Sequence, residues 1–190
     1  PGGSGDWFND IEVDAVKVDN TAPTVAVTST TGNGSYKADD TINVTLTFNE
    51  NVTSSHTLTV TLETGDTDRT CTTAGIINGT TTATCTYTVQ AGDTSADLSV
   101  SSIVVDNSGT ITDAAGNPAN LTPTSNINNT SDIVIDTTAP ADFTTGLVTV
   151  TGGTVITGYW NSTNTGVDVV VPVADDSSLV GGTIQLQAKR

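Results

Sequence analysis

Hydrophobic and polar residues alternate along much of the chain, which is the pattern of half-buried β-strands. In TINVTLTF, residues 41–48, every second residue is apolar and the residues between are Thr or Asn, so one side of the strand suits a core and the other suits solvent. The same alternation predicts strands at residues 24–28, 57–63, 81–89, 97–105 and 132–136. The phase slips within 97–105, which predicts a β-bulge there. No segment keeps an apolar stripe of helical period over ten residues.

Turn-forming residues separate these strands at short intervals. Clusters rich in Gly, Asn and Asp recur, such as ETGDTD at 63–68 and DAAGNP at 113–118, and such residues are typical of tight turns. Strands with one apolar and one Thr-rich face need a second sheet to cover the apolar faces. The pattern therefore predicts an all-β fold, an Ig-like β-sandwich of about seven strands in Greek-key order.

The sequence before the first strand returns at the end of the last one. VKVDNTAP at 16–23 matches IVIDTTAP at 133–140 when Pro23 is aligned with Pro140, 117 residues further along. A period of this length has the size of a whole domain. We therefore expect three segments: the terminal strand of a preceding unit at 1–19, a complete sandwich at 20–136, and the start of a second Ig-like unit at 137–190.

The second unit is expected to begin with a strand near Leu147 and to continue with strands at 167–173 and 183–189. Residues 10–19 (DIEVDAVKVD) resemble a final strand without its domain, and the opening residues PGGSGDWF lead us to expect a piece of a longer chain. Two interpretations stay open. The chain is an arbitrary cut, or the N-terminal strand of one copy completes the second unit of another copy by strand donation, which would build a filament.

Charge excludes two classes of partner. The 190 residues carry 5 Lys and Arg against 21 Asp and Glu, a formal net charge of −16. Nucleic acid binding needs cationic side chains to neutralise phosphates, and an anionic membrane surface would repel this chain. No run of apolar residues is long enough to insert into a membrane. Cations are the partners that such a composition favours.

Five stretches together resemble a known family. VDNTAPTV (18–25), FNENV (48–52), YTVQAGDTSADL (87–98), ITDAAGNPA (111–119) and IVIDTTAP (133–140) are similar in order and spacing to tandem bacterial Ig-like repeats of large secreted and cell-surface proteins of the adhesin or surface-layer type. Residues 141–190 resemble a different repeat of the same kind. The resemblance implies an extracellular or cell-surface location, neighbouring Ig-like domains or identical subunits as partners, and a structural role without enzymatic activity.

Carboxylates at the junctions are the first candidate site. In repeats similar to these, such carboxylates bind Ca²⁺ and lock one domain against the next, and Ca²⁺ takes six to eight oxygen ligands. Proline after the junction also keeps the linker extended. The candidate ligands are Asp19, Asp39, Asp40, Glu50, Asp106, Asp113, Asn117 and Asp136. The alternative is that these residues only form turns and carry solubilising charge.

Cys71 and Cys85 are the only cysteines. An even pair on strand regions of an extracellular domain predicts a structural disulfide. Zinc binding is not expected, because two Cys and one distant His do not supply four ligands. Eight asparagines begin N-x-S/T sequons, and compositional bias explains part of this number. The candidate glycosylation sites are Asn33, Asn43, Asn51, Asn78, Asn120, Asn128 and Asn161, with Asn129 beginning an overlapping sequon.

Catalysis is not expected. His56 follows Ser54 and Ser55, but adjacent residues rarely converge on one point as a catalytic triad requires, and no G-x-S-x-G motif is present. The prediction is a rigid, non-catalytic spacer stiffened by Ca²⁺. One alternative is the strand-donating filament subunit. The other is a glycan-binding adhesin module, for which Tyr159 and Trp160 are the candidate stacking residues, although we expect them to pack at the rim of the second core.

Overall fold

The computed structural model describes residues 17–173, 179 and 181–187. The chain divides into two compact units, Pro1–Thr137 and Thr138–Arg190, called unit 1 and unit 2 below. The division falls one residue after the expected end of the complete sandwich. The expected terminal strand at 10–19 lies outside the described residues except for residues 17–19, and these three do not form a strand.

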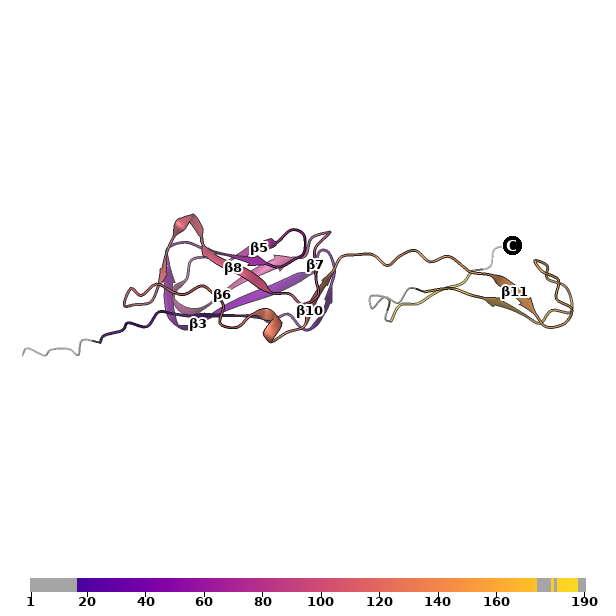
Figure 1. Ribbon diagram of the computed structural model, residues 1–190, viewed down its shortest axis with the longest axis horizontal. Helices are drawn as coiled ribbons and strands as arrows, with labels where there is room; N and C mark the ends of the chain where they lie inside the picture. Colours follow the sequence, from indigo (N-terminus) through magenta and orange to yellow (C-terminus); the bar gives the residue numbers. More distant parts are fainter. Residues whose placement is uncertain (1–16, 174–178, 180, 188–190) are drawn as a thin grey trace, which may run out of the picture. The chain divides into compact units, whose positions relative to one another are not determined.

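Unit 1 is built from three small sheets (Figure 1). The first contains β1 (Val25–Ser29), β3 (Thr41–Ser54) and β6 (Asn78–Thr88), with β9 (Ile111–Thr112) on the far part of β3. The second has the order β5 (Arg69–Thr72), β4 (Leu58–Leu62), β8 (Val100–Val105). The third has the order β2 (Gly34–Tyr36), β10 (Ile133–Asp136), β7 (Thr94–Ser95). Two short 3₁₀ turns, Asp106–Ser108 and Ile127–Asn129, complete the unit.

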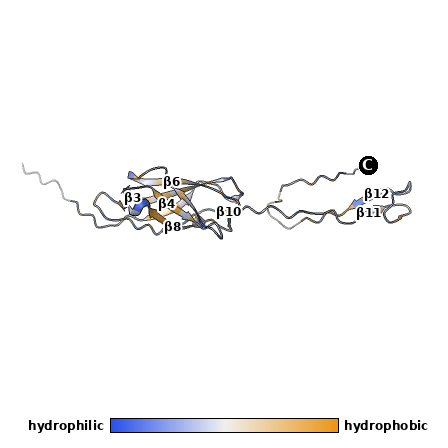
Figure 2. Cartoon of the chain, turned by 90° about the horizontal axis from the view of Figure 1, so that it is seen from above, coloured by the Kyte–Doolittle hydropathy of each residue, from blue (hydrophilic) through white to orange (hydrophobic). Residues whose placement is uncertain are grey.

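The core of unit 1 lies between the sheets and follows the predicted alternation. Ile42, Val44 and Leu46 of β3 are fully buried, whereas Thr47, between Leu46 and the buried Phe48, is exposed. The opposing sheet contributes Leu58, Val60 and Leu62, so each sheet covers the apolar face of the other. Figure 2 shows hydrophobic positions in orange along the strands of unit 1. The prediction of an all-β sandwich is confirmed; the Greek-key order stays a prediction.

The predicted disulfide is present and joins the two main sheets. Cys71 on β5 and Cys85 on β6 are bonded, with their Cα atoms 5.6 Å apart, and both side chains are buried. β8, at the other edge of this sheet from β5, carries the predicted bulge: Thr61 pairs with Ser102 but Leu62 pairs with Val100, so Ser101 is the extra residue. The covalent link and the packed sheets make unit 1 a rigid support.

Unit 2 has far less structure in its described residues. β11 (Val148–Thr151) and β12 (Gly166–Val169) form an antiparallel pair. Two strand predictions were wrong in extent: the one at 167–173 ends at Val169, and residues 183–187 form no strand. All the buried hydrophobic side chains in the described residues belong to unit 1. A two-stranded ribbon of this kind is marginally stable by itself.

Candidate metal centre

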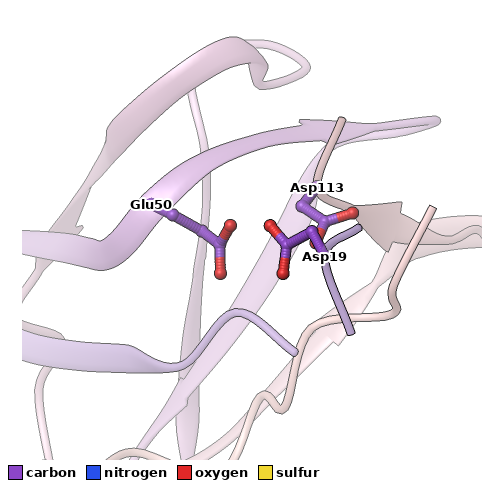
Figure 3. Close-up of side chains that lie close together, drawn as sticks. All are labelled: Asp19, Glu50 and Asp113. Atoms are coloured by element: carbon purple, nitrogen blue, oxygen red, sulfur yellow. The ribbon is translucent and has the colours of Figure 1, made fainter. Parts of the chain in front are cut away.

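Three carboxylates meet at one end of unit 1, which we call the N-terminal pole. Asp19, Glu50 and Asp113 each place a carboxylate oxygen within 4.8 Å of the others. Figure 3 shows the three side chains pointing toward one another from three separate segments. They belong to the segment before β1, to β3 and to the loop after β9.

An irregularity in β3 places Glu50. Thr47 pairs with Thr82 of β6, but the next paired residue of β3 is Val52, opposite Thr80. Between these pairs β3 therefore has more residues than its partner, as in a β-bulge, which bends a strand and redirects its side chains. Glu50 lies within this stretch and is half-buried.

A tight turn places Asp113. Its Oδ1 accepts hydrogen bonds from the backbone N–H groups of Ala115 and Asn117, both at 2.8 Å, and Gly116 has the left-handed backbone (φ 91°) that the turn requires. This is an Asx turn, so DAAGN does form a turn, as the alternative interpretation expected. Asp113 is nevertheless only 7% exposed, and its carboxylate is one of the three in the cluster.

Asn117 ties the N-terminal segment to this turn. Its Nδ2 donates hydrogen bonds to Asp113 Oδ2 at 2.7 Å and to the backbone oxygen of Asp19 at 3.0 Å. The Asp19 side chain accepts from the N–H of Thr21 at 3.0 Å, and Pro23 is buried, with its oxygen accepting from Asn120 N–H. Asn117 was predicted as a ligand through its oxygen; in this arrangement its amide nitrogen faces the cluster and positions two of the carboxylates.

The cluster is electrostatically uncompensated. Partial burial, followed by the negative charges of Asp19 and Asp113, raises the pKa of Glu50. Burial also acts to raise the pKa of Asp113, but hydrogen bonds from Asn117, Ala115 and Gly116 outweigh it and lower that pKa overall. The ion pairs in the described part of the chain are Lys37–Asp40 and Arg69–Asp93, so neither brings a cation to the cluster.

The three carboxylates fit a hard divalent cation. Two oxygens on opposite sides of a Ca²⁺ ion at about 2.4 Å lie about 4.8 Å apart, so oxygens that all lie within 4.8 Å of one another can share one ion. The donors are all carboxylate oxygens, which suit Ca²⁺, Mg²⁺ or Mn²⁺ rather than metals that prefer thiolate or imidazole. A bound cation would also remove the repulsion within the cluster.

The other four predicted ligands lie apart from this centre. Asp39 and Asp40 precede β3, and Asp40 accepts from Lys37 N–H at 2.9 Å and pairs with the Lys37 ammonium at 3.7 Å. Glu50 follows Asp40 by ten positions along β3, roughly 30 Å of extended chain, so Asp40 lies at the opposite pole. Asp136 pairs with Thr94 of β7. In the described part of the chain, none of the four belongs to a group of three or more metal-ligating side chains.

The carboxylate of Asp106, the fourth of these residues, accepts hydrogen bonds from threonine hydroxyl groups. Its two oxygens accept hydrogen bonds from Thr57 at 2.5 Å and Thr59 at 2.7 Å. These bonds lower the pKa of Asp106, with a smaller contribution from the nearby His56. The contacts hold the 3₁₀ turn against β4, which is a structural role.

The Ser-His pairs of the sequence do not form a triad. Ser54 is buried, donates to the His56 backbone oxygen and accepts from Ile77 N–H. Ser55 Oγ lies 3.1 Å from His56 Nδ1, but Asp106 binds threonine hydroxyls instead of the imidazole. That catalysis is absent stays a prediction.

The aromatic pair of unit 2 differs from expectation. Tyr159 is 71% exposed and Trp160 is 57% exposed, so neither packs at the rim of a core. The expectation was wrong because the described residues of unit 2 contain no core for them to join. An apolar cavity lies elsewhere in unit 2 and is lined in part by Phe143, Val173 and Ile184.

The sequon asparagines are mostly accessible. Six are exposed, namely Asn33, Asn43, Asn51, Asn78, Asn120 and Asn128. Asn161 is half-buried, and its Nδ2, the atom that a glycan would modify, donates to the Thr154 oxygen at 2.7 Å. Glycosylation therefore stays a prediction for all seven and is least compatible with the structure at Asn161.

Comparisons of the chain with protein-family models, with curated proteins and with solved structures gave no match. In the part of the chain that the structure describes, there is no helix with the length and apolar character needed to cross a membrane. The disulfide indicates a compartment outside the reducing cytoplasm.

Proposed function

We propose that this chain is a non-catalytic spacer segment of a secreted or cell-surface protein, and that Ca²⁺ bound by Asp19, Glu50 and Asp113 stiffens its N-terminal junction. The observation that carries the proposal is the convergence of these three carboxylates at the pole of unit 1. Extracellular Ca²⁺ modules work at about 10⁻⁴–10⁻³ M, a range that suits a centre with three carboxylates and remaining positions open to water.

The mechanism follows from where the ligands sit. Glu50 and Asp113 belong to the packed sandwich, whereas Asp19 belongs to the segment that leads into it. One cation shared by all three would fix that segment to the body of unit 1. Stiffness at this point transmits force along a stalk and limits bending between neighbouring domains. The acidic composition, with a net charge of −16, supports cation binding of this kind.

Hydrogen exchange tests the stiffening directly. We expect Ca²⁺ at millimolar concentration to slow exchange of the backbone amides in residues 17–24 relative to EDTA, because their opening would require release of Asp19 from the ion. Glu50→Gln should abolish this slowing, whereas Asp66→Asn, a change of equal charge in the 63–68 turn, should leave it intact. Unchanged exchange in the wild-type chain, or equal slowing in Glu50→Gln, would refute the proposal.

A further inference from the structure

The chain contains two Asn-Gly pairs, Asn33–Gly34 and Asn78–Gly79. In such a pair the backbone nitrogen of the glycine can attack the side-chain carbonyl carbon of the asparagine and close a cyclic succinimide. Glycine favours this step because it has no side chain to obstruct the approach and its backbone turns freely. Both asparagines are exposed to solvent, so the hydrogen bonds around each pair decide which one can reach the reactive geometry.

Asp132 holds both reacting groups of the first pair. The Asp132 N–H donates to Asn33 Oδ1 at 3.1 Å, and the Gly34 N–H donates to the Asp132 backbone oxygen at 2.9 Å. Gly34 is also the first residue of β2 and pairs with Ile133 of β10. Ring closure at Asn33 therefore requires two hydrogen bonds to break and the end of a sheet to open.

The second pair lies at a β-bulge and is held by fewer hydrogen bonds. Asn78 and Thr80 pair with two consecutive residues of β3, so Gly79 between them is the extra residue of a bulge in β6. Gly79 has a left-handed backbone (φ 65°), and an added Cβ would meet no atom within 4 Å. Its N–H donates to Thr53 Oγ1 at 3.2 Å. Among the described residues, the Asn78 side chain makes no hydrogen bond.

From this difference we propose that Asn78 is a site of spontaneous backbone modification in the folded protein, and that Asn33 is protected from the same reaction. The Gly79 nitrogen loses its proton to solvent and bonds to Asn78 Cγ, and the Cγ–Nδ2 bond breaks to release ammonia. Water then opens the succinimide at either of its two carbonyl groups and leaves aspartate or isoaspartate. The net reaction consumes one water and releases one ammonia, with no oxidation or reduction.

The modification changes the chain at a point where β6 meets the core. Isoaspartate lengthens the main chain by one carbon atom and adds one negative charge. The preceding residue, Ile77, is buried, and its N–H and backbone oxygen bond to Ser54 Oγ at 2.8 Å and to Ser54 N–H at 2.9 Å. We expect the longer main chain to break these two bonds. The result is a slow, irreversible loosening of the end of β3 that also carries Glu50.

Peptide mapping by mass spectrometry tests the site. The full chain, made in a host that does not glycosylate asparagine, is incubated at mildly alkaline pH in EDTA, both folded and in guanidinium chloride with the disulfide intact. Conversion raises the mass of a peptide by the difference between water and ammonia, and chromatography separates aspartate from isoaspartate. Asn78→Gln is the matched control, because its longer side chain keeps the amide but closes a ring far more slowly.

The two pairs should convert at comparable rates in denaturant and at different rates in the folded chain. We expect Asn33 to react about tenfold more slowly than Asn78 when folded, because more hydrogen bonds must open first. Asn78→Gln should show no product at residue 78 and unchanged conversion of Asn33. A folded chain in which Asn78 stays intact, or in which Asn33 converts as fast as Asn78, would overturn the proposal.

Hydrogen exchange tests the structural consequence. The incubated chain that contains isoaspartate at residue 78 is compared with freshly prepared Asn78→Asp, which has the added charge but not the longer main chain. We expect the amides of residues 50–54 and of Ile77 to exchange faster in the first protein alone. Unchanged exchange in the isoaspartate form would refute the loosening of β3, and equally fast exchange in both proteins would assign it to charge instead of main-chain length.

Discussion

The side-chain nitrogen of Asn117 lies 3.0 Å from the backbone oxygen of Asp19, although 98 residues separate them in sequence. The same nitrogen donates to Asp113 Oδ2 at 2.7 Å. Asn117 therefore sets the distance between two carboxylate-bearing segments before any ion arrives. Preorganisation of this kind lowers the cost of bringing like charges together at a metal site.

Replacing Asn117 should weaken metal binding although its nitrogen, not its oxygen, faces the cluster. Asn117→Ala removes both hydrogen bonds, so Asp19 loses its tie to the turn. We expect the Ca²⁺ dissociation constant to rise about tenfold, in the range found for residues that orient metal ligands. Calorimetric titration measures this change. Asn128→Ala, at an exposed position, is the matched control. An unchanged affinity in Asn117→Ala would show that Asn117 does not position the metal ligands.

Ca²⁺ affinity should fall in acid. The pKa of Glu50 is raised by burial and by its two acidic neighbours, so protons compete with the metal at higher pH than they would for an ordinary glutamate. Titrations between pH 7 and pH 4.5 should show affinity decreasing as Glu50 gains its proton. In Glu50→Gln the remaining dependence should shift to lower pH. A wild-type affinity constant down to pH 4.5 would contradict this prediction.

A second acidic residue should govern acid stability. Asp93 is 1% exposed and accepts hydrogen bonds from Arg69 Nε at 2.8 Å and from the Tyr87 hydroxyl at 2.5 Å. Burial acts to raise its pKa, but the bonds from Tyr87, Arg69 and the Gln90 N–H outweigh it and lower that pKa. A depressed carboxyl pKa stabilises the fold above the unfolded-state pKa, and this stability is lost as pH falls through the folded-state value.

Arg69→Met tests that network at neutral pH. The substitution leaves the Asp93 charge buried without its ion-pair partner, and we expect a loss of about 3 kcal/mol in the free energy of unfolding. Denaturant unfolding at pH 7 and at pH 3 measures it. The difference between variant and wild type should shrink at pH 3, because loss of Arg69 removes a cause that lowers the Asp93 pKa, so the variant's Asp93 gains a proton more readily and its unpaired charge is relieved. An equal difference at both pH values would show that Arg69 acts through packing alone.

The disulfide should contribute to the free energy of unfolding independently of the Asp93 network. Cys71 and Cys85 are 14 residues apart in sequence and join sheets on opposite sides of the core. Closing a loop of this length is worth about 3 kcal/mol. Unfolding of C71S/C85S compared with the oxidised wild-type chain should show a loss of that order. Reduction of the wild-type chain should produce the same loss, since the sequence contains no other cysteine.

The alternation of apolar residues and the cysteine pair made the sandwich predictable. The metal cluster was not predictable as a group, because it depends on how the strands bend and meet in the folded unit. Ile42, Val44 and Leu46 could be assigned to the core because strand side chains alternate with a fixed period. Glu50 could not be separated from Asp39 and Asp40, because its position depends on an irregular stretch of β3 that continues beyond the predicted end at residue 48. Residues 49–51 contain no apolar side chain, and Phe48 and Val52 keep the same phase, so the pattern shows no slip at this bulge.

The repeat was informative in one respect and incomplete in another. It identified Asp19 and Asp136 as equivalent positions. Equivalent positions in the repeat do not show which other carboxylates lie beside each aspartate. Asp19 meets Glu50 and Asp113, and at the 117-residue offset Val167 stands opposite Glu50, so Glu50 has no acidic counterpart. The candidate site therefore follows from residues brought together by the fold of unit 1 and not from the junction motif itself.

The most direct test of the central claim is thermal unfolding of the wild-type chain and of Glu50→Gln, each in EDTA and in millimolar Ca²⁺. A raised folded-state pKa means that ionised Glu50 destabilises the metal-free fold above pH 4.5, so in EDTA at pH 7 the variant should melt at the same temperature as wild type or higher. Ca²⁺ at about ten times its dissociation constant adds about 1.4 kcal/mol of stability, which should raise the wild-type melting temperature by roughly 3–6 °C and place it above the variant. Reversal of the order between the two buffers is the predicted result; equal responses of both proteins to Ca²⁺, or a more stable wild type in EDTA, would contradict the account.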